Sequence, residues 1–390
     1  GVLLGLGLYA IGAFLFYPAM LTGNYYPFLI AYFILTCGLS FLETSCNPYI
    51  LSMGDEATST RRLNLAQSFN PMGSLLGMYV AMNFIQNRLN PMDTMERSQL
   101  SDTEFAAVRD SDLMVLIAPY LIIGLVILAM LIVIRMVKMP KNGDQSHNIN
   151  FLPTLKRIFG IHHYREGVIA QFFYVGAQIA VWSFVIRYAM QQLDFDGVLA
   201  SLGNTASADA VVDALRNVEP VSAAFYNGCE WLGLNDLLPR TAEQAAATYY
   251  IMSLILFVAM RFLCTGMMKY VKAYKLLIGL AILAVLCCLG AMFGKGHFGV
   301  YCLMGISGCM SLMFPTIYGF GLTGLGEDTK IGGSGMVMAI AGAAVLTQIQ
   351  GIVSDQTGSI MTAYIVPAIA FAVIAYYGYF VAKKQELSTK

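Results

Sequence analysis

The chain has 390 residues, of which 57% are hydrophobic and only 12% are charged, and its mean hydropathy is +0.65. Soluble domains carry about a quarter charged residues, so this composition excludes an ordinary soluble enzyme and indicates a polytopic protein of the lipid bilayer. The formal net charge is zero, which argues against a nucleic-acid partner. The eight cysteines show no metal-ligand spacing, and we expect neither a metal site nor a disulfide framework.

Apolar segments recur along the whole chain, and ten of them are long enough to cross a bilayer, which takes about 20 residues as a helix. They cover residues 1–20, 27–52, 62–86, 113–136, 165–190, 245–268, 273–293, 298–321, 331–353 and 360–382. This pattern predicts an all-α membrane protein.

The basic residues predict the orientation of these spans. Fifteen Lys and Arg residues fall in one set of connections, and only six fall in the alternate set. Cytoplasmic connections are richer in Lys and Arg, so the first set, which includes the C-terminus, is predicted to lie in the cytoplasm.

Two connections are long. Residues 137–164 are basic and polar, and they hold an amphipathic piece in which Pro153 could open a helix. We predict that this cytoplasmic linker separates an N-terminal bundle, residues 1–136, from a C-terminal bundle, residues 165–390. Residues 191–244 form an acidic insertion on the outer side, which either decorates the outer mouth or covers the substrate entrance.

A weak internal repeat relates the two halves. The stretches CGLSFLETSCNPYILSMGDEATSTRR and SGCMSLMFPTIYGFGLTGLGEDTKIG share a small-residue helix and a late proline, Pro48 or Pro315. Each then has a turn of glycine and two acids. Repeats of this kind are typical of secondary transporters, which bind substrate between the halves near the bilayer midplane. If the halves match, two further spans are expected before Gly1.

Glu43 is the residue that first indicates a function. It lies in an apolar predicted helix, where a charged side chain at the centre costs about 3 kcal/mol. Asn47 follows four residues later and therefore shares its helix face. Ionisable residues at such positions usually mark an ion or substrate path, so we expect Glu43 to face the bundle interior.

Two further polar stripes suit a sugar. Gln67, Asn70 and Ser74 recur at spacings of three and four, as do four residues of the fifth predicted span: Gln171, Tyr174, Gln178 and Trp182. Amides pair with hydroxyl groups, and aromatic faces cover the apolar side of a sugar ring. Alternatively, any one amide only joins helices by hydrogen bonds, and Tyr174 and Trp182 are only packing aromatics.

Two arginines lie within predicted spans. Arg187 is close to the outer end of its helix, where its side chain can simply extend to the interface. Arg261 is deeper and needs a partner, either in a cytoplasmic-gate ion pair or at the binding site. The four histidines fall in loops or at membrane edges, so a histidine proton relay is not expected.

Four stretches carry a family resemblance: LETSCNPY, RRLNLAQSFNPMG, QFFYVGAQIAVWSFVIRYA and LMFPTIYGFGLTGLGEDTK. They resemble the fucose–galactose–glucose:proton symporter family of the major facilitator superfamily, over nearly the whole chain except residues 191–244. The resemblance implies twelve helices in two six-helix bundles, alternating access, a monomer, and a place in the bacterial inner membrane. Gly1 would then begin the third helix, and the first two helices would be absent from this chain.

The resemblance also implies roles for single residues. Glu43 matches a glutamate that takes part in proton coupling, and Gln67 and Asn70 match residues of the sugar cavity. A second acidic residue of the family lies on the first helix and cannot be assigned here. No cofactor is implied beyond the coupling proton.

The expected function is therefore proton-coupled import of a monosaccharide, with L-fucose favoured over galactose or glucose. Some relatives use sodium, so a sodium-coupled or uncoupled hexose carrier is the alternative, as is an inactive truncated fragment. An intramembrane enzyme would need clustered His, Asp or Ser near a membrane face, and no such cluster is visible.

Overall fold

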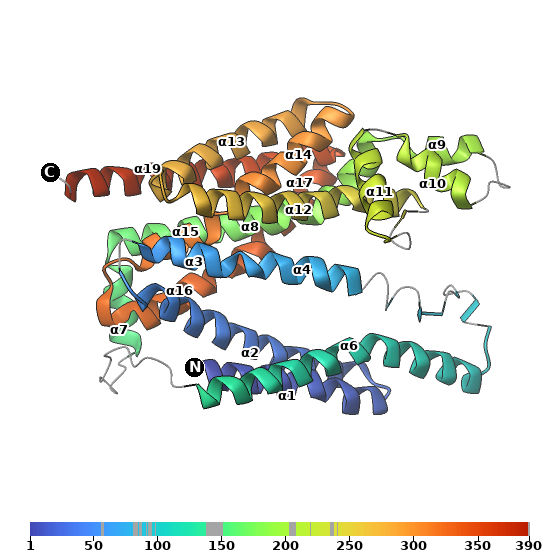
Figure 1. The fold of residues 1–390 in the computed structure, drawn as a ribbon, viewed down its shortest axis with the longest axis horizontal. Helices are drawn as coiled ribbons and strands as arrows, with labels where there is room; N and C mark the ends of the chain where they lie inside the picture. Colours follow the sequence, from blue (N-terminus) through green and yellow to red (C-terminus); the bar gives the residue numbers. More distant parts are fainter. Residues whose placement is uncertain are drawn as a thin grey trace. The chain divides into compact units, whose positions relative to one another are not determined.

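The computed structural model describes residues 1–55, 58–80, 85, 88–90, 92, 96–97, 99–137, 151–202, 208–218, 220–234, 238–239 and 241–388. These residues form helices and no strand, and nine of the helical stretches among them are long and apolar enough to cross a membrane. The all-α prediction is thus confirmed (Figure 1). The chain divides into two compact units.

Nine of the ten predicted spans coincide with these candidate membrane helices. The remaining predicted span, residues 62–86, is present as α3 (Ser59–Gln67) and α4 (Phe69–Val80), and residues 81–84 lie outside the described part. Unit 1 comprises Gly1–Met53 and Leu76–His147, and unit 2 comprises Gly54–Leu75 and Asn148–Lys390. The units differ from the predicted bundles at residues 54–75, so the division into bundles stays a prediction.

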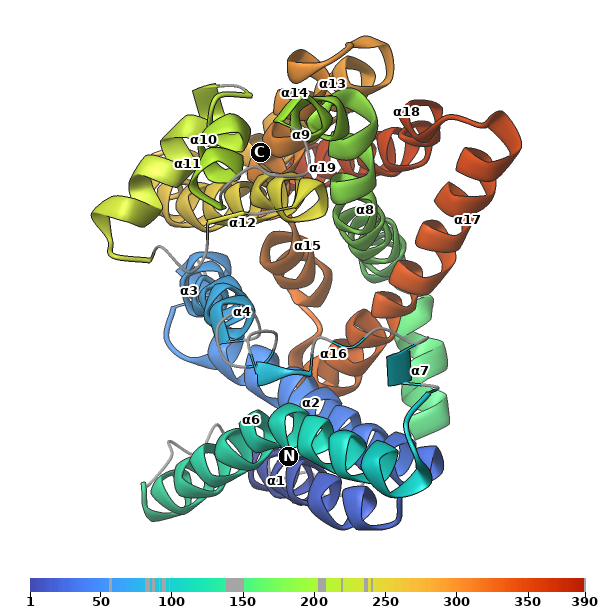
Figure 2. The same cartoon turned by 90° about the vertical axis from the view of Figure 1, so that its right-hand side faces the viewer.

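Unit 1 is built from three long helices: α1 (Val2–Leu21), α2 (Tyr25–Ser52) and α6 (Asp102–Met136). In Figures 1 and 2 they lie side by side, with α1 against both others. Ala13, Phe16, Leu35 and Ile117 lie in their shared core, where van der Waals packing holds the helices together. The Phe16 ring stacks on Tyr120 with centroids 4.4 Å apart.

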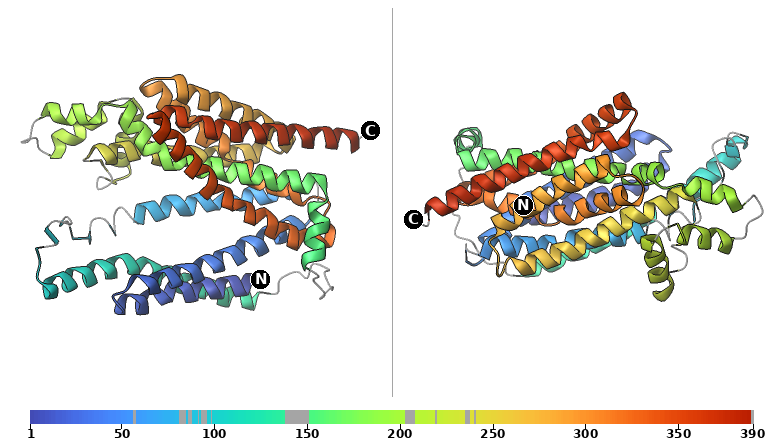
Figure 3. Two further views of the ribbon diagram at one scale, coloured as in Figure 1. Left: turned by 180° about the vertical axis from the view of Figure 1, so that it is seen from behind. Right: turned by 90° about the horizontal axis from the view of Figure 1, so that it is seen from above.

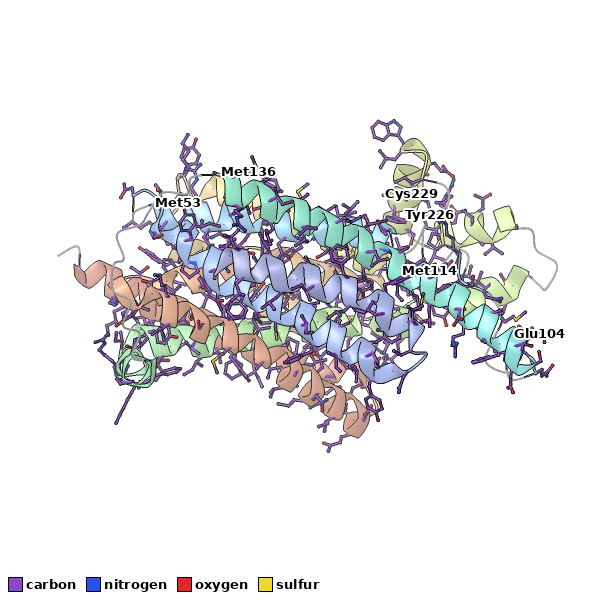
Figure 4. All side chains as sticks on the ribbon, turned by 90° about the horizontal axis from the view of Figure 1, so that it is seen from below. Met53, Glu104, Met114, Met136, Tyr226 and Cys229 are labelled. Atoms are coloured by element: carbon purple, nitrogen blue, oxygen red, sulfur yellow. The ribbon has the colours of Figure 1, made fainter. Side chains whose placement is uncertain are left out.

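Helix α6 begins eleven residues before the predicted span, because a capping box starts it. The Ser101 hydroxyl accepts a hydrogen bond from the Glu104 N–H at 3.4 Å, and the Glu104 carboxylate accepts one from the Ser101 N–H at 3.1 Å. These two bonds satisfy N–H groups that a helix start leaves open. Figure 4 shows α6 running from Glu104 past Met114 to Met136.

Unit 2 is a bundle arranged around α8. Its helices are α3, the first part of α4, α7 (Phe151–Phe159), α8 (His162–Gln192), α9 (Phe195–Leu202), α10 (Ala208–Arg216), α11 (Pro220–Trp231), α12 (Ala242–Met267), α13 (Ala273–Phe293), α14 (His297–Met310), α15 (Met313–Leu322), α16 (Thr329–Met338), α17 (Gly342–Thr357), α18 (Ile360–Ala363) and α19 (Ile365–Ser388). Short 3₁₀ turns, η5 (Gly326–Asp328) and η6 (Ala339–Ala341), flank α16.

Three buried tyrosines fix α8 along its length. Tyr164 donates to the Gly332 carbonyl at 2.9 Å, Tyr174 to Met310 at 3.1 Å and Tyr188 to Ala291 at 2.6 Å. Each hydroxyl thereby meets a backbone acceptor inside an apolar bundle, where an unpaired one would be costly. Because the three bonds reach α16, α14 and α13, helix α8 is held at both ends and in the middle.

Two membrane helices of unit 2 are interrupted near a proline. The helix α14–α15 breaks at Ser311 and Leu312, just before Pro315, and α3–α4 breaks at Ser68, just before Pro71. Proline has no backbone N–H and its ring displaces the preceding turn, so breaks at these places are expected physically. Sequence hydropathy alone did not resolve them.

The predicted amphipathic piece of the linker is helix α7, with Pro153 in its first turn as expected. Arg157 of this helix meets Asp328 of η5 in a two-pronged ion pair, with Nη2 2.6 Å from Oδ1 and Nε 3.2 Å from Oδ2. The turn of glycine and two acids in the second repeat stretch is η5, and its Asp328 therefore holds α7 through this ion pair.

The insertion forms three short helices, α9, α10 and α11, at the end of unit 2 opposite the C-terminus of α19 (Figure 3). Arg216 of α10 pairs with Glu230 of α11, and its guanidinium lies 6.0 Å from the Tyr226 ring centroid. Tyr249 of α12 holds the insertion through the Ser222 hydroxyl, 3.0 Å away. The insertion is therefore a small packed cap on α12.

Candidate functional site

The acidic part of the candidate site lies in α2 of unit 1. The Asn47 Nδ2 donates to Glu43 Oε2 at 2.7 Å, which confirms that the two residues share a helix face. Asn47 is buried and Glu43 is half-buried. A carboxylate accepts hydrogen bonds in its charged form, so the Asn47 amide stabilises the charge in a helix otherwise made of apolar residues.

The amide residues of α3 and α4 belong to unit 2. Gln67, the last residue of α3, is half-buried, and its backbone carbonyl accepts a hydrogen bond from Arg261 Nη1 at 2.9 Å. Asn70 follows the helix break and is exposed. The two amides are thus placed at a broken helix, where backbone polar groups become available next to side chains.

The four residues of the predicted polar stripe on α8 differ in how deeply they are buried. Gln171 and Tyr174 are completely buried, and the Tyr174 hydroxyl donates to the Met310 carbonyl. Among the described residues, no group bonds to the Gln171 amide. Gln178 and Trp182 are half-buried and lie closer to the helix surface.

Trp182 is held by an aromatic cluster. Its ring meets Phe257 edge to face at 5.2 Å and Tyr250 at 6.4 Å, and its Nε1 donates to the Ser307 hydroxyl at 3.2 Å. Edge-to-face pairs contribute about 0.5–1.5 kcal/mol beyond burial. These contacts hold the indole in one orientation.

The two arginines have different surroundings. Arg261 is buried at 4% exposure, with its guanidinium 4.6 Å from the Phe257 ring centroid. It donates to the backbone carbonyls of Ser311 and Gln67, and it forms no ion pair with any described residue. Arg187 is exposed near the Phe184 ring, 6.0 Å from its centroid. A gating role for either residue remains a prediction.

The structure adds residues that sequence reasoning missed. Asn64 is fully buried, and its amide donates to the Thr316 hydroxyl at 3.2 Å, which joins α3 to α15. It precedes Gln67 by three residues, so extending the amide stripe backwards would have found it. Ser307 and Phe257 belong to no polar stripe in the sequence. Their contacts with Trp182 place them in the candidate site.

Comparison with solved structures defines the class of protein. The fold matches a crystal structure of the Escherichia coli fucose:proton symporter with a TM-score of 0.81 and 32% identity, over 98% of this chain and 83% of that one. A second crystal structure describes the symporter as a major facilitator superfamily transporter in the outward conformation. This chain is therefore a membrane transporter with the fold of that superfamily, and not an enzyme.

Comparison with curated proteins defines the family. An L-fucose-proton symporter of Haemophilus influenzae is 39% identical over 97% of this chain and 80% of that protein. A glucose/galactose transporter of Brucella abortus is 28% identical over 97% of this chain and 77% of that protein. The chain belongs to the fucose–galactose–glucose:proton symporter family. No protein-family model matches it.

Proposed function

We propose that this chain imports a monosaccharide together with a proton by alternating access. The observation that carries this proposal is the hydrogen-bonded Glu43–Asn47 pair in an apolar helix, in a chain 39% identical to an L-fucose-proton symporter. L-fucose is the proposed substrate, with galactose or glucose as the alternatives that the Brucella relative suggests.

Glu43 is proposed as the proton carrier. Its ionised form is costly in the membrane and is stabilised by the Asn47 amide, whereas its neutral form needs no such support. Protonation from the outside therefore removes the charge that opposes movement of the loaded carrier. Release of the sugar and the proton into the cytoplasm then resets the carrier.

The proposed sugar ligands of unit 2 are Gln67, Asn70, Gln171, Tyr174, Gln178 and Trp182, and Asn47 of unit 1 is a further proposed ligand. The half-buried amides can reach hydroxyl groups, and the fixed indole of Trp182 can cover the apolar side of a sugar ring. No cofactor enters this scheme, because the coupling ion supplies the energy. One proton moving down 100 mV provides about 2.3 kcal/mol, which permits roughly fifty-fold accumulation of the sugar.

The test is Glu43→Gln, measured by sugar uptake into proteoliposomes with and without a proton gradient. The amide cannot carry a proton, so uphill accumulation should be lost while exchange of labelled for unlabelled sugar is retained. Full uphill uptake by this variant would contradict the proposal. Thr44→Ala, on the next residue of the same helix, is the matched control.

Coupling to sodium is the competing proposal. Addition of L-fucose to vesicles should make the outside medium alkaline if protons are carried, and should leave its pH unchanged if sodium is carried or if transport is uncoupled. A competition panel with L-fucose, D-galactose and D-glucose then ranks the sugars. A version extended by two N-terminal spans, assayed in parallel, distinguishes a transporter from an inactive fragment.

We also propose a cytoplasmic C-terminus, a monomeric carrier, and two bundles that move against each other, residues 1–136 and 165–390 with the linker 137–164 between them. The excess of Lys and Arg in one set of connections supports this orientation. The bacterial inner membrane is the proposed location, since the similar proteins are bacterial transporters.

A further inference from the structure

Two backbone carbonyls in unit 2 lose their helical hydrogen bond for the same reason. In a continuous helix, a carbonyl accepts from the N–H four residues later. The residue four after Gln67 is Pro71, and the residue four after Ser311 is Pro315. Proline has no N–H, so both carbonyls need another donor inside an apolar bundle.

Arg261 is the donor for both. Its Nη1 donates to the Gln67 carbonyl at 2.9 Å, and its Nε donates to the Ser311 carbonyl. The guanidinium carries five N–H groups in a rigid plane, which allows one side chain to serve two acceptors at once. The Phe257 ring, 4.6 Å from the guanidinium carbon, lies beneath it.

We propose that Arg261 is a positioning residue for sugar binding, which it serves by holding the backbone of Gln67 at the break between α3 and α4. The role rests on the proposed function, because Gln67 is a proposed sugar ligand. With its carbonyl held, Gln67 presents its side-chain amide in one orientation. Arg261 itself does not touch the sugar.

This role differs from a gate ion pair. The partners of Arg261 are neutral carbonyls, so the geometry of its donors is needed as well as its charge. Lysine keeps the charge but offers a single ammonium group on a flexible stem, which cannot reproduce the planar fork. Arg261→Lys should therefore impair positioning, whereas an ion pair would tolerate it better.

The prolines provide a selective test. Pro71→Ala restores an N–H opposite the Gln67 carbonyl, so that Arg261 is no longer needed there. Pro315→Ala restores the N–H only opposite Ser311, and it is the matched control. Sugar binding can be followed by fluorescence of Trp182, which contacts Phe257, once the second tryptophan, Trp231, is replaced in a Trp231→Phe background.

In this background, Arg261→Lys should raise the L-fucose concentration for half-maximal binding at least tenfold, with D-galactose and D-glucose measured in parallel. The added Pro71→Ala should reduce that rise to less than threefold, and the added Pro315→Ala should leave it near tenfold. Thermal unfolding of the same samples measures the fraction of folded protein. Each binding affinity is calculated for that folded fraction.

The outcomes separate the two proposals. An Arg261→Lys protein that binds sugar like its parent overturns the positioning role alone, and so does equal rescue by both proline substitutions, which indicates support of the bundle only. A parent that binds none of the three sugars removes the proposed function, and the positioning role with it.

Discussion

At the scale of single residues, two fully buried amides stand out in unit 2. Gln171 of α8 and Gln350 of α17 have no hydrogen-bond partner among the described residues, and neither side chain reaches solvent. A buried amide without a partner costs about 1–3 kcal/mol. Gln171 belongs to the proposed sugar stripe and Gln350 does not. Comparing substitutions of the two residues therefore distinguishes a role in sugar binding from a purely structural role.

Replacing either glutamine by methionine should therefore stabilise the protein by about 1–3 kcal/mol, since the unpaired polar group disappears while the length of the side chain is kept. Gln171→Met should in addition weaken sugar binding at least tenfold, and Gln350→Met should not. Thermal unfolding in detergent and equilibrium sugar binding measure the two effects. Unchanged affinity in Gln171→Met would remove this residue from the sugar site.

The sequence predicted part of the candidate site at this scale. The Glu43–Asn47 contact follows from helical spacing alone, and the structure confirms it. The partners of Arg261 could not be predicted, because backbone carbonyls carry no sequence signal until the helix breaks are known. The burial of Gln171 depends on packing between helices distant in sequence, which periodicity does not describe.

At the scale of helices, α1 and α2 approach each other very closely. A Cβ atom on Gly12 would lie 2.6 Å from the Leu35 Cα, so the glycine is needed for the crossing. For Gly7, on the same helix, the nearest atom found among the described residues is Leu131 Cδ1, 3.8 Å from its Cβ position. Small residues at such crossings allow van der Waals packing that holds membrane helices together.

Gly12→Ala should accordingly destabilise the protein by about 1–3 kcal/mol, because the backbones must separate to admit a methyl group. Gly7→Ala, the matched control, should be neutral or slightly stabilising, since alanine is the better helix former. Thermal unfolding midpoints in one detergent compare the two. A Gly12→Ala protein as stable as the parent would show that the crossing tolerates the extra methyl.

Helix positions were predicted well, and helix interruptions were not. The span 273–293 coincides with α13, because a helix bounded by polar turns has clear ends in hydropathy. The spans 298–321 and 331–353 each contain a break in the structure, since hydropathy averages over residues that are apolar on both sides of it. Pro315 stands out in the repeat, yet the hydrogen bond from Arg261 to the Ser311 carbonyl is seen only in the structure.

At the scale of the whole molecule, the insertion offers a way to test which side of the chain faces the outside of the cell. Cys229 is only 6% exposed, whereas Trp231, two residues later on α11, is 85% exposed. Figure 4 shows Cys229 beside Tyr226 on that helix. Burial raises the pKa of the Cys229 thiol, with a smaller contribution from the nearby Glu230 charge.

A membrane-impermeant maleimide should therefore label Trp231→Cys rapidly in intact cells, and label Cys229 slowly. The thiolate is the reactive form, and a raised pKa leaves less of it at neutral pH, so labelling of Cys229 should increase as the pH rises. Lys384→Cys should react only after the membrane is permeabilised. The opposite pattern, with Lys384→Cys labelled in intact cells, would reverse the proposed orientation.

Helix α6 has 35 residues and is about 52 Å long at a rise of 1.5 Å per residue, whereas the hydrocarbon core is only about 30 Å thick. Its first nine residues include the exposed Asp102, Glu104 and Asp110, so this end is expected to extend beyond the hydrocarbon core as a helical rod. Membrane proteins of this size offer few rigid features outside a detergent micelle. An antibody fragment raised against this rod would give electron cryo-microscopy images a fixed mark for particle alignment, and would leave the transport path free.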